Sequence, residues 1–463
     1  MREYIKTENY TLYHGSMLDM QDVIYKDSID AIVTDPPYEL GFMGKSWDNS
    51  GIAFKKETWK KCLDVLKPGG YMLAFGGSRT FHRIACAIED AGFEIRDTIM
   101  WVYSTGFPKS MNIGLAVDKK MGVESKSVGT RKQSGAKFKL TQELIDNGGF
   151  NDSNRTEYEV YEAHNEWKGW GTALKPAYEP VIIARKPCEG STIDNVLEHG
   201  VGGINIDECR ISLNGGKKTP GGCKTRKDNT SHLSFKSKCV NKEDNSVGRY
   251  PANLILTYDD SDYEEVCGGF PVGKKNGSIS RPYKKNNNIY GKYGDCNTFA
   301  AYDDSGSAVR YFYCAKATKK DRDEGLDALE TKYRGMSNQA KAELERGNNG
   351  FDGNENTIGL NRVVARKNDH PCVKPTELMQ YLIRLVTPNG GTILDPFNGA
   401  GSTGKAVMYE NKERNKDYKY IGIELDEHYL EISKGRIDYA MQDKHVENTE
   451  MEGQISIFDF LGV

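Results

Sequence analysis

The sequence has no long apolar run, no paired-cysteine motif and little net charge. No stretch approaches the length of a membrane-spanning helix, and the first residues, Met1–Lys6, contain no signal-peptide apolar segment. The ten cysteines form no C-x-x-C pair, which argues against a disulfide framework. We therefore expect a soluble, cytoplasmic protein with reduced cysteines and no contact with a membrane. No metal is expected either, because the spacing of Cys223, His232 and Cys239 matches no common zinc finger.

The net charge at pH 7 is only −3, from 63 Lys and Arg against 66 Asp and Glu. The field of the whole molecule therefore does not indicate a nucleic-acid binder, but the basic residues are unevenly distributed. Two Gly-rich stretches collect them, the second with interleaved tyrosines: Lys217, Lys218, Lys224, Arg226, Lys227, Lys236 and Lys238, then Lys274, Lys275, Arg281, Lys284, Lys285 and Lys292. They are candidate nucleic-acid contacts, with solvated charged loops as the alternative.

Apolar runs alternate with amphipathic patterns at both ends of the chain. Ile29–Thr34 and Tyr71–Phe75 are predicted strands, with a helical pattern between them. Ser78 is positioned to cap a second helix, and Thr376 and Asp426 to cap two helices near the C-terminus. This alternation predicts an α/β fold in which parallel strands are joined by crossover helices.

A short string of rigid residues follows the first of these strands. In Asp35-Pro36-Pro37-Tyr38 the prolines restrict the backbone, so that the Asp35 carboxylate and the Pro36 carbonyl are fixed acceptors. A base amine is a poor nucleophile because its lone pair is delocalised into the ring, and acceptors on its N–H groups localise that pair. Tyr38 offers a face on which a flipped base stacks. The string indicates methylation of a base amine, although it also occurs as an ordinary turn.

The next segment, residues 41–48, mixes glycines, aromatic residues and a lysine. Phe42, Lys45 and Trp47 are its candidate substrate contacts, in a lid that would order over an extruded base and its phosphate. A surface loop without such a role is the alternative.

A Gly-rich loop follows an apolar strand near the other end of the sequence. Gly399, Gly401 and Gly404 fit G-x-G-x-x-G, a turn that lets a nucleoside ligand approach the backbone. Asp395 precedes the loop with a carboxylate that suits a ligand ammonium and not a pyrophosphate. Glu424, at the end of the next strand, is positioned to accept hydrogen bonds from both hydroxyls of a ribose. The pattern therefore favours S-adenosylmethionine over NAD as the cofactor.

These residues resemble those of the bacterial and phage DNA amino-methyltransferases, which modify adenine N6 or cytosine N4. The order matches the permuted arrangement called beta, in which the catalytic tetrapeptide comes first and the cofactor loop last. The resemblance implies a Rossmann-like, S-adenosylmethionine-dependent methyltransferase sheet, circularly permuted, with inserted target-recognition regions. It also implies catalytic roles for Asp35, Pro36, Pro37 and Tyr38.

The resemblance implies further site residues as well. His370–Pro375 is similar to the family segment that lines the methionine part of the cofactor. The cofactor-binding residues would be Asp395, Phe397, Gly399, Gly401, Thr403, Glu424, Lys374 and Thr376, and the DNA contacts Phe42, Lys45, Trp47, Lys224, Arg226 and Lys227. One position departs from the pattern: Ser16 stands where many relatives have an acid that binds the cofactor's adenine, and Asp19 is the alternative for that contact.

Changes of pattern along the chain then predict its domain organisation. The segments are a catalytic half (1–110), an insert (111–170), a strand returning to the catalytic domain (171–189), a target-recognition region (190–365), a cofactor-binding half (366–445) and a C-terminal tail (446–463). In the tail, Gln454–Phe458 resembles the peptide by which bacterial proteins dock on the replication sliding clamp, with a terminal strand as the alternative.

Aspartate at the first catalytic position is commoner in the adenine enzymes of this family. We therefore expect site-specific transfer of a methyl group to the N6 amine of a flipped adenine in double-stranded DNA, without a metal or a covalent enzyme intermediate. The alternatives are a cytosine-N4 DNA methyltransferase, a structured-RNA adenine methyltransferase and a non-catalytic DNA-binding module. A monomer and a homodimer are both compatible with the sequence, as are an orphan role and one in restriction-modification.

Overall fold

A computed structural model describes thirteen stretches of the chain: residues 1–41, 46–103, 110–123, 126–132, 157–211, 248–257, 270, 272–273, 306–307, 312–314, 320–329, 332–334 and 364–442. The chain divides into two compact units. The first comprises Met1–Ser104, Tyr178–Glu330 and Lys367–Val463, and the second Thr105–Ala177 and Thr331–Arg366. No helix among the described residues is long and apolar enough to cross a membrane.

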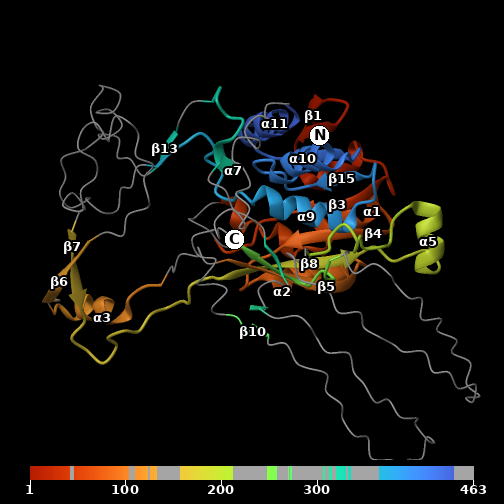
Figure 1. The fold of residues 1–463 in the computed structure, drawn as a ribbon. Helices are drawn as coiled ribbons and strands as arrows, with labels where there is room; N and C mark the ends of the chain where they lie inside the picture. The colour runs from red at the N-terminus through yellow and green to blue at the C-terminus, as the bar shows by residue number, and fades with distance from the viewer. Residues whose placement is uncertain are drawn as a thin grey trace, which may run out of the picture. The chain divides into compact units, whose positions relative to one another are not determined.

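The first unit is built on one large sheet, whose described strands follow the order β1-β2-β16-β15-β3-β4-β8-β5-β9-β12 (Figure 1). The strands are β1 (Arg2–Lys6), β2 (Tyr10–His14), β3 (Ile29–Thr34), β4 (Leu66–Phe75), β5 (Glu94–Tyr103), β8 (Tyr178–Arg185), β9 (Leu254–Thr257), β12 (Tyr313–Cys314), β15 (Thr392–Asp395) and β16 (Lys419–Glu424). The Rossmann-like α/β class predicted from the sequence is confirmed.

The last two described strands lie between two of the first. β16 pairs in parallel with β2, and β15 pairs in parallel with both β16 and β3. β3 continues the parallel arrangement into β4. β8 breaks it, because it runs antiparallel to both of its neighbours, β4 and β5. The predicted parallel strands are thus found in β2, β16, β15, β3 and β4, while β8 and the edge strand β1 run antiparallel to their neighbours.

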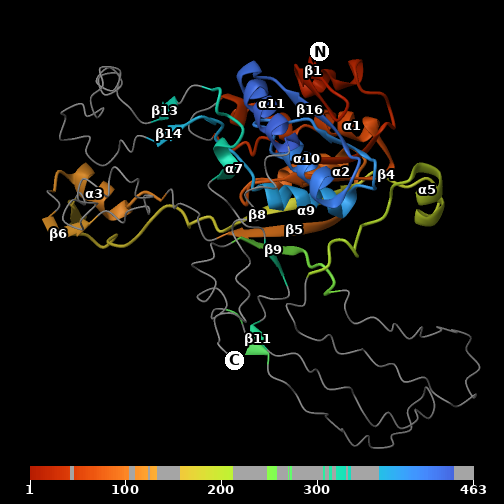
Figure 2. The same cartoon turned by 45° about the horizontal axis from the view of Figure 1, so that its top comes forward.

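Helices cover both faces of this sheet. α9 (Thr376–Val386), α10 (Ser402–Arg414) and α11 (Glu427–Met441) pack on one face, as Figure 2 shows, and α1 (Lys56–Val65) and α2 (Phe81–Asp90) on the other. Successive residues of β3 enter opposite cores, Val33 on the α9 side and Ile32 on the α1 side. Burial on both faces explains why β3 reads as an unbroken apolar run.

Two of the three predicted helix caps are wrong. α2 begins after Thr80 and not after Ser78, because a tight turn in which Thr80 N donates to Gly77 O precedes the helix. α9 has Pro375 at its N-cap, and Thr376 is its first helical residue. Asp426 caps α11 as predicted, since its side chain accepts a hydrogen bond of 3.0 Å from His428 N.

The second unit contains regular structure in part of the segment where the sequence pattern lapses. Its elements include α3 (Ile113–Met121) and the antiparallel strands β6 (Lys126–Lys132) and β7 (Glu157–Glu162). The buried Asp118 of α3 accepts hydrogen bonds from His164 N and Asn165 Nδ2, which tie the helix to the chain beyond β7. A further antiparallel pair is formed by β13 (Lys332–Arg334) and β14 (Val364–Arg366).

Candidate active site and cofactor loop

The two motifs found at opposite ends of the sequence follow adjacent strands. β3, which precedes Asp35, pairs with β15, which ends at Asp395. The strands are parallel, so both motifs leave the sheet at the same edge, where α/β proteins bind their ligands. Thr34 Oγ1 donates a hydrogen bond of 2.7 Å to Asp395 Oδ1 and joins the two motifs directly.

The carboxylate of Asp395 is a buried junction between β3, β15 and α10. Thr34 Oγ1 and Phe397 N donate to its Oδ1, and Thr403 Oγ1 donates to its Oδ2 at 2.6 Å. Its exposed fraction is 2%, and burial raises its pKa to about 6. Asp395 and Thr403 thus have structural partners, and their contact with a cofactor stays a prediction.

The loop after β15 has a conformation that only glycine fits well. Gly399 has φ +50° and Gly401 has φ +71°, both in the left-handed region. A Cβ on Gly401 would lie 2.3 Å from Ser433 Oγ, and one on Gly399 would lie 2.9 Å from His370 Nε2. Side chains of the cofactor-binding half therefore pack against the backbone of this loop. The helix α10 starts directly after the loop.

Glu424 lies beside this loop at the end of β16. Its Oε2 accepts a hydrogen bond of 2.7 Å from Gly399 N, and its Oε1 accepts bonds of 2.9 Å from Leu425 N and Asp426 N. Burial raises the pKa of this carboxyl. The Phe397 ring packs on the α1 side of the sheet, 6.4 Å from the Trp59 ring between centroids. Ribose recognition by Glu424 fits this placement and stays a prediction.

The position that departs from the family pattern lies next to Glu424. Gly15 N donates to Glu424 O at 2.9 Å. Ser16 caps the short helix η1 (Met17–Asp22) by accepting from Leu18 N, and Asp19 lies in the first turn of that helix. These distances do not test the alternative contact between Asp19 and the adenine of the cofactor.

Lys374 contacts the catalytic tetrapeptide. Its Nζ donates to Asp35 Oδ2 at 2.7 Å and to the Tyr38 hydroxyl at 3.2 Å, and lies 3.3 Å from Glu179 Oε2. Burial, at an exposed fraction of 6%, acts to lower the pKa of Lys374, but the charges of Asp35 and Glu179 outweigh it and raise the pKa. The ammonium is therefore held charged against Asp35, while its predicted contact with the cofactor stays a prediction.

Tyr38 is fixed at both ends. Its hydroxyl donates to Glu179 Oε2 at 2.8 Å, and its carbonyl accepts from Thr80 Oγ1 at 2.7 Å. Burial raises the pKa of the phenol well above its usual value, so that it remains a neutral donor. Sequence reasoning missed Glu179, and the one signal for it was an acid at the start of the otherwise apolar strand β8.

One oxygen of Asp35 has no partner. Asp35 Oδ1 is buried and accepts no hydrogen bond within the described part of the chain, whereas Oδ2 is bound by Lys374. A buried carboxylate oxygen without a donor is costly, so that native proteins rarely leave one unless a ligand or water supplies the donor. The site is thus short of one N–H or O–H donor at Asp35 Oδ1.

The carboxylates of Asp48 and Glu39 bind backbone amides at the two ends of the predicted lid. The buried Asp48 carboxylate accepts from Glu39 N at 2.9 Å and from Leu40 N at 3.2 Å. The Glu39 carboxylate in turn accepts from Gly51 N at 2.7 Å and from Ala53 N at 3.3 Å. Both ends of the predicted lid are therefore anchored to each other.

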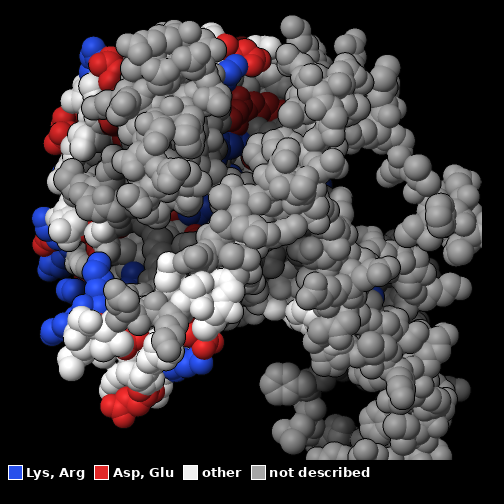
Figure 3. Space-filling model, turned by 90° about the vertical axis from the view of Figure 1, so that its left-hand side faces the viewer, with Lys and Arg blue, Asp and Glu red and all other residues white. Residues whose placement is uncertain are grey.

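Several predicted contacts lie outside the described residues. They are Phe42 and Lys45, the side chain of Trp47, the basic residues Lys224, Arg226 and Lys227, and the tail peptide Gln454–Phe458. On the described part of the face in Figure 3, Lys and Arg are interspersed with Asp and Glu.

Thr376 contacts a short acidic segment of the region between the two halves. Its hydroxyl donates to the carboxylate of Asp321 in α7 (Lys320–Asp323). The buried Lys405 of α10 lies 2.8 Å from Glu324 Oε2 in the same segment. Arg436 donates to the carbonyls of both Ala400 and Asp321, so that the segment packs beneath the cofactor loop. Contact of Thr376 with the cofactor stays a prediction.

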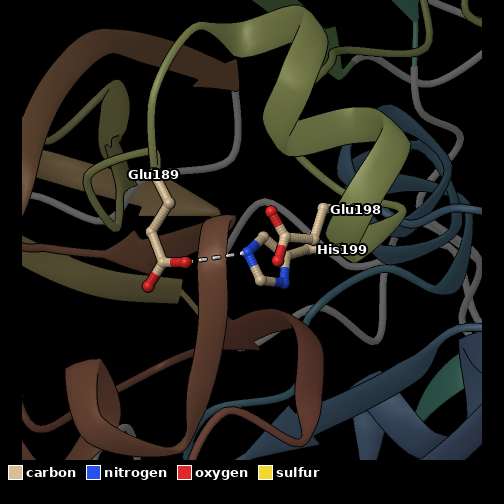
Figure 4. A group of neighbouring side chains, drawn as sticks. All are labelled: Glu189, Glu198 and His199. Atoms are coloured by element: carbon tan, nitrogen blue, oxygen red, sulfur yellow. Dashed lines mark hydrogen bonds and ion pairs between the residues drawn. The ribbon is translucent and has the colours of Figure 1, made fainter.

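Glu189, Glu198 and His199 form a surface cluster at α5 (Thr192–His199). Their nearest ligand atoms lie within 4.8 Å of one another, and Figure 4 shows His199 turned toward Glu189, with 3.2 Å between Nε2 and Oε2. Both glutamates are exposed. Such exposed carboxylates are common without a metal, and the cluster shares no residue with the catalytic tetrapeptide or the cofactor loop.

The chain also matches the model of a known family. The N6/N4 methyltransferase model, described as DNA methylase, matches residues 29–435. This match covers most of the sequence, and the chain therefore belongs to the DNA methylase family. The resemblance inferred from the two motifs and their order is confirmed.

Individual relatives match shorter regions. The type II methyltransferase M.ScaI of Streptomyces caespitosus is 33% identical over 86 residues, 19% of this chain and 26% of that protein. M.HindIII of Haemophilus influenzae is 24% identical over 153 residues, 32% of this chain and 37% of that protein. The chain thus spans less than half of these curated relatives. The PvuII DNA methyltransferase structure, named as cytosine-N4-specific, aligns over 96% of this chain and 92% of its own, at 13% identity and a TM-score of 0.39.

Proposed function

We propose that this chain is an S-adenosylmethionine-dependent DNA methyltransferase that modifies the N6 amine of a flipped adenine. The observation that carries the proposal is the unpaired, buried Asp35 Oδ1, at the same sheet edge as the cofactor loop. An amine N–H would supply the donor that this oxygen lacks. Of the two amino-methylation chemistries in the family, adenine N6 is favoured by the aspartate at this position.

The residues around the loop fit the cofactor. Gly399 and Gly401 let a nucleoside approach the backbone, and Glu424 lies beside them. Its Oε1 already accepts two backbone hydrogen bonds, whereas its Oε2 accepts one and has a further lone pair available. S-adenosylmethionine supplies the methyl group on a positively charged sulfur when bound. Because that ligand carries an ammonium and no phosphate, it suits a loop flanked by Asp395 and Glu424 better than a dinucleotide does.

The catalytic tetrapeptide acts on the base. Asp35 Oδ1 and the Pro36 carbonyl accept the two N–H groups of the amine, which localises the nitrogen lone pair toward the methyl donor. Lys374 holds Asp35 through Oδ2, and so leaves Oδ1 directed at the amine. The Tyr38 ring, fixed through its hydroxyl and its carbonyl, stacks on the base. Most of the rate then comes from orientation and fixed electrostatics.

Nucleoside mass spectrometry of DNA from cells that express the chain tests the proposal. We expect N6-methyladenine with the wild type and a fall of about 10²–10³-fold in the single-turnover rate with Asp35→Asn. Cofactor affinity, measured by calorimetry, should stay within about threefold, since Asp35 contacts the base. Asp417→Asn, at an exposed acid whose partner is Lys419, is the matched control.

Each outcome separates the alternatives. N4-methylcytosine in place of N6-methyladenine would correct the base and retain the enzyme class. Methylated RNA with unmodified DNA would favour the structured-RNA alternative. Binding of DNA without cofactor affinity would favour the non-catalytic module, and undiminished methylation by Asp35→Asn would contradict the role of Asp35. Clamp docking through Gln454–Phe458 is a separate prediction, tested by a pull-down with and without residues 453–463.

A further inference from the structure

Two carboxylates share one ammonium at the catalytic tetrapeptide. Lys374 Nζ has three donors, and its polar neighbours among the described residues are Asp35 Oδ2, the Tyr38 hydroxyl and Glu179 Oε2. All of these side chains are buried or largely buried, with exposed fractions of 8%, 19% and 20% for the side chains of Lys374, Asp35 and Glu179. The direction of each Lys374 hydrogen is therefore set by protein groups more than by water.

Glu179 contacts Tyr38, which stacks on the base in the proposed function, and Lys374, which holds Asp35. Its Oε2 accepts from the Tyr38 hydroxyl at 2.8 Å and lies next to Lys374, while its Oε1 accepts from the Tyr103 hydroxyl at 3.2 Å. It stands on β8, a central strand paired on both sides, with Trp101 as its partner on β5. Side chains on paired strands hold their positions better than side chains on loops.

Removing the Glu179 carboxylate would change which acceptors the Lys374 ammonium binds. Without Glu179, one donor of Lys374 would lose its acceptor in a site with little water. The nearby acceptor that is still unpaired is Asp35 Oδ1. Lys374 would then bind both oxygens of Asp35 and occupy the atom that the target amine needs. The Tyr38 hydroxyl would lose its acceptor at the same time.

We propose that Glu179 is a positioning residue for methyl transfer, which draws Lys374 away from Asp35 Oδ1 and fixes the ring of Tyr38. The inference rests on the proposed function, because it assigns Oδ1 to the amine. It adds a residue from the antiparallel strand β8 to a site otherwise built from β3 and the segment before α9. Glu179 touches neither base nor cofactor in this role, and acts through Lys374 and Tyr38.

Single-turnover methylation with three variants tests this role. Glu179→Gln removes the negative charge and one of the two acceptor oxygens that hold Lys374, Tyr38 and Tyr103. It should lower the rate by about 10–100-fold, because misplacement of reacting groups costs rates of this order. The cofactor Kd should change by less than about threefold, and Glu179→Asp, which keeps the charge, should recover part of the rate. Tyr103→Phe is the matched control, since it removes a hydrogen bond to Glu179 Oε1 without touching Lys374 or Tyr38.

A double-mutant cycle separates positioning from a general structural effect. If Glu179 acts in part through the Tyr38 hydroxyl, Tyr38→Phe combined with Glu179→Gln should lose much less than the product of the two single losses. Independent, multiplicative losses would overturn the coupling, as would a Glu179→Gln rate equal to that of the wild type. Should Glu179→Gln fail to fold, Tyr38→Phe removes the same bond from its other end and should itself lower the rate.

The failure of this inference differs from a failure of the proposed function. A wild-type chain that methylates no DNA in the presence of S-adenosylmethionine would overturn both. A wild-type chain that methylates DNA, with a Glu179→Gln variant that loses only cofactor affinity, would retain the function and overturn the positioning role.

Discussion

Thr34 and Asp395 are hydrogen-bonded over 2.7 Å although 361 residues separate them in the sequence. The bond joins the strand before the catalytic tetrapeptide to the strand before the cofactor loop. A methyl donor and a base held by these two motifs therefore share one sheet edge.

Thr34→Val should weaken the junction without changing the volume of the side chain much. Asp395 Oδ1 would keep Phe397 N as its donor and lose a hydroxyl, and hydrogen bonds to charged groups contribute about 1.5–3 kcal/mol. We expect the free energy of unfolding in urea to fall by about that amount and the cofactor to bind more weakly. Thr11→Val, at a strand threonine whose hydroxyl makes no hydrogen bond among the described residues, should have a much smaller effect.

The buried Asp395 carboxyl should make stability depend on pH. Burial raises its pKa from 3.8 to about 6, so the folded chain binds this proton more tightly than the unfolded chain does. This contribution is present below pH 4 and is lost as the pH rises through about 6, and it corresponds to about 3 kcal/mol. Asp395→Asn lacks it. Urea unfolding of both proteins at pH 4 and pH 7 measures the difference, and identical pH dependence would contradict the prediction.

The cofactor loop should not tolerate alanine at Gly401. Gly401 and Gly390 have nearly equal φ values, +71° and +75°, but a Cβ meets Ser433 only at Gly401, and no atom within 4 Å at Gly390. Gly390→Ala should cost about 1 kcal/mol from backbone strain alone. Gly401→Ala should cost about 1–3 kcal/mol more, with a large loss of cofactor affinity. Equal unfolding temperatures and equal cofactor affinities of the two variants would contradict the prediction.

The base of the predicted lid depends on Asp48. Asparagine at this position keeps one oxygen for Glu39 N or Leu40 N and introduces a donor that faces the other amide. We expect Asp48→Asn to lower kcat/KM for DNA by about tenfold, with an unchanged cofactor Kd, because one charge-assisted bond is lost. Asp64→Asn, at a surface acid paired with Lys60 and Gln21, is the control. A change in cofactor Kd alone would contradict a role in the lid.

The packing behind the loop includes a buried ion pair between α9 and α10. Arg384 Nε lies 3.0 Å from Glu410 Oε2, and Glu410 is fully buried. Glu410→Ala leaves the guanidinium uncompensated and should reduce the free energy of unfolding by about 3–5 kcal/mol. Asp207→Ala, which removes an exposed acid paired with Arg210, should cost less than about 1 kcal/mol. Similar urea midpoints for these two variants would refute the difference.

The sequence predicted the central strands well because their surroundings leave a local signal. β3 and β15 are buried on both faces, so each reads as an apolar run that ends in a functional motif. The direction of β8 left no such signal. Whether a strand runs parallel or antiparallel depends on the path of the connecting chain, and the hydrophobic pattern is the same either way.

The site was predicted in part for a similar reason. The tetrapeptide and the glycine loop are contiguous strings whose chemistry can be read locally. Glu179 is a single acid, and its meaning comes from Lys374, which is distant in the sequence and 3.3 Å away in space. Thr376 was predicted as a cap from its residue type, but Pro375 occupies the cap, and the Thr376 hydroxyl binds Asp321 instead.

The insertion of β15 and β16 between β2 and β3 has a consequence for biosynthesis. On the ribosome, β2 and β3 emerge early, but the two strands that lie between them in the sheet are translated more than 350 residues later. At about 5–20 residues per second this delay is roughly 20–70 s. During that time the amide edges of β2 and β3 are open to other nascent chains. We therefore expect nascent chains that are arrested before β15 is translated to need a chaperone. The completed chain should no longer need it.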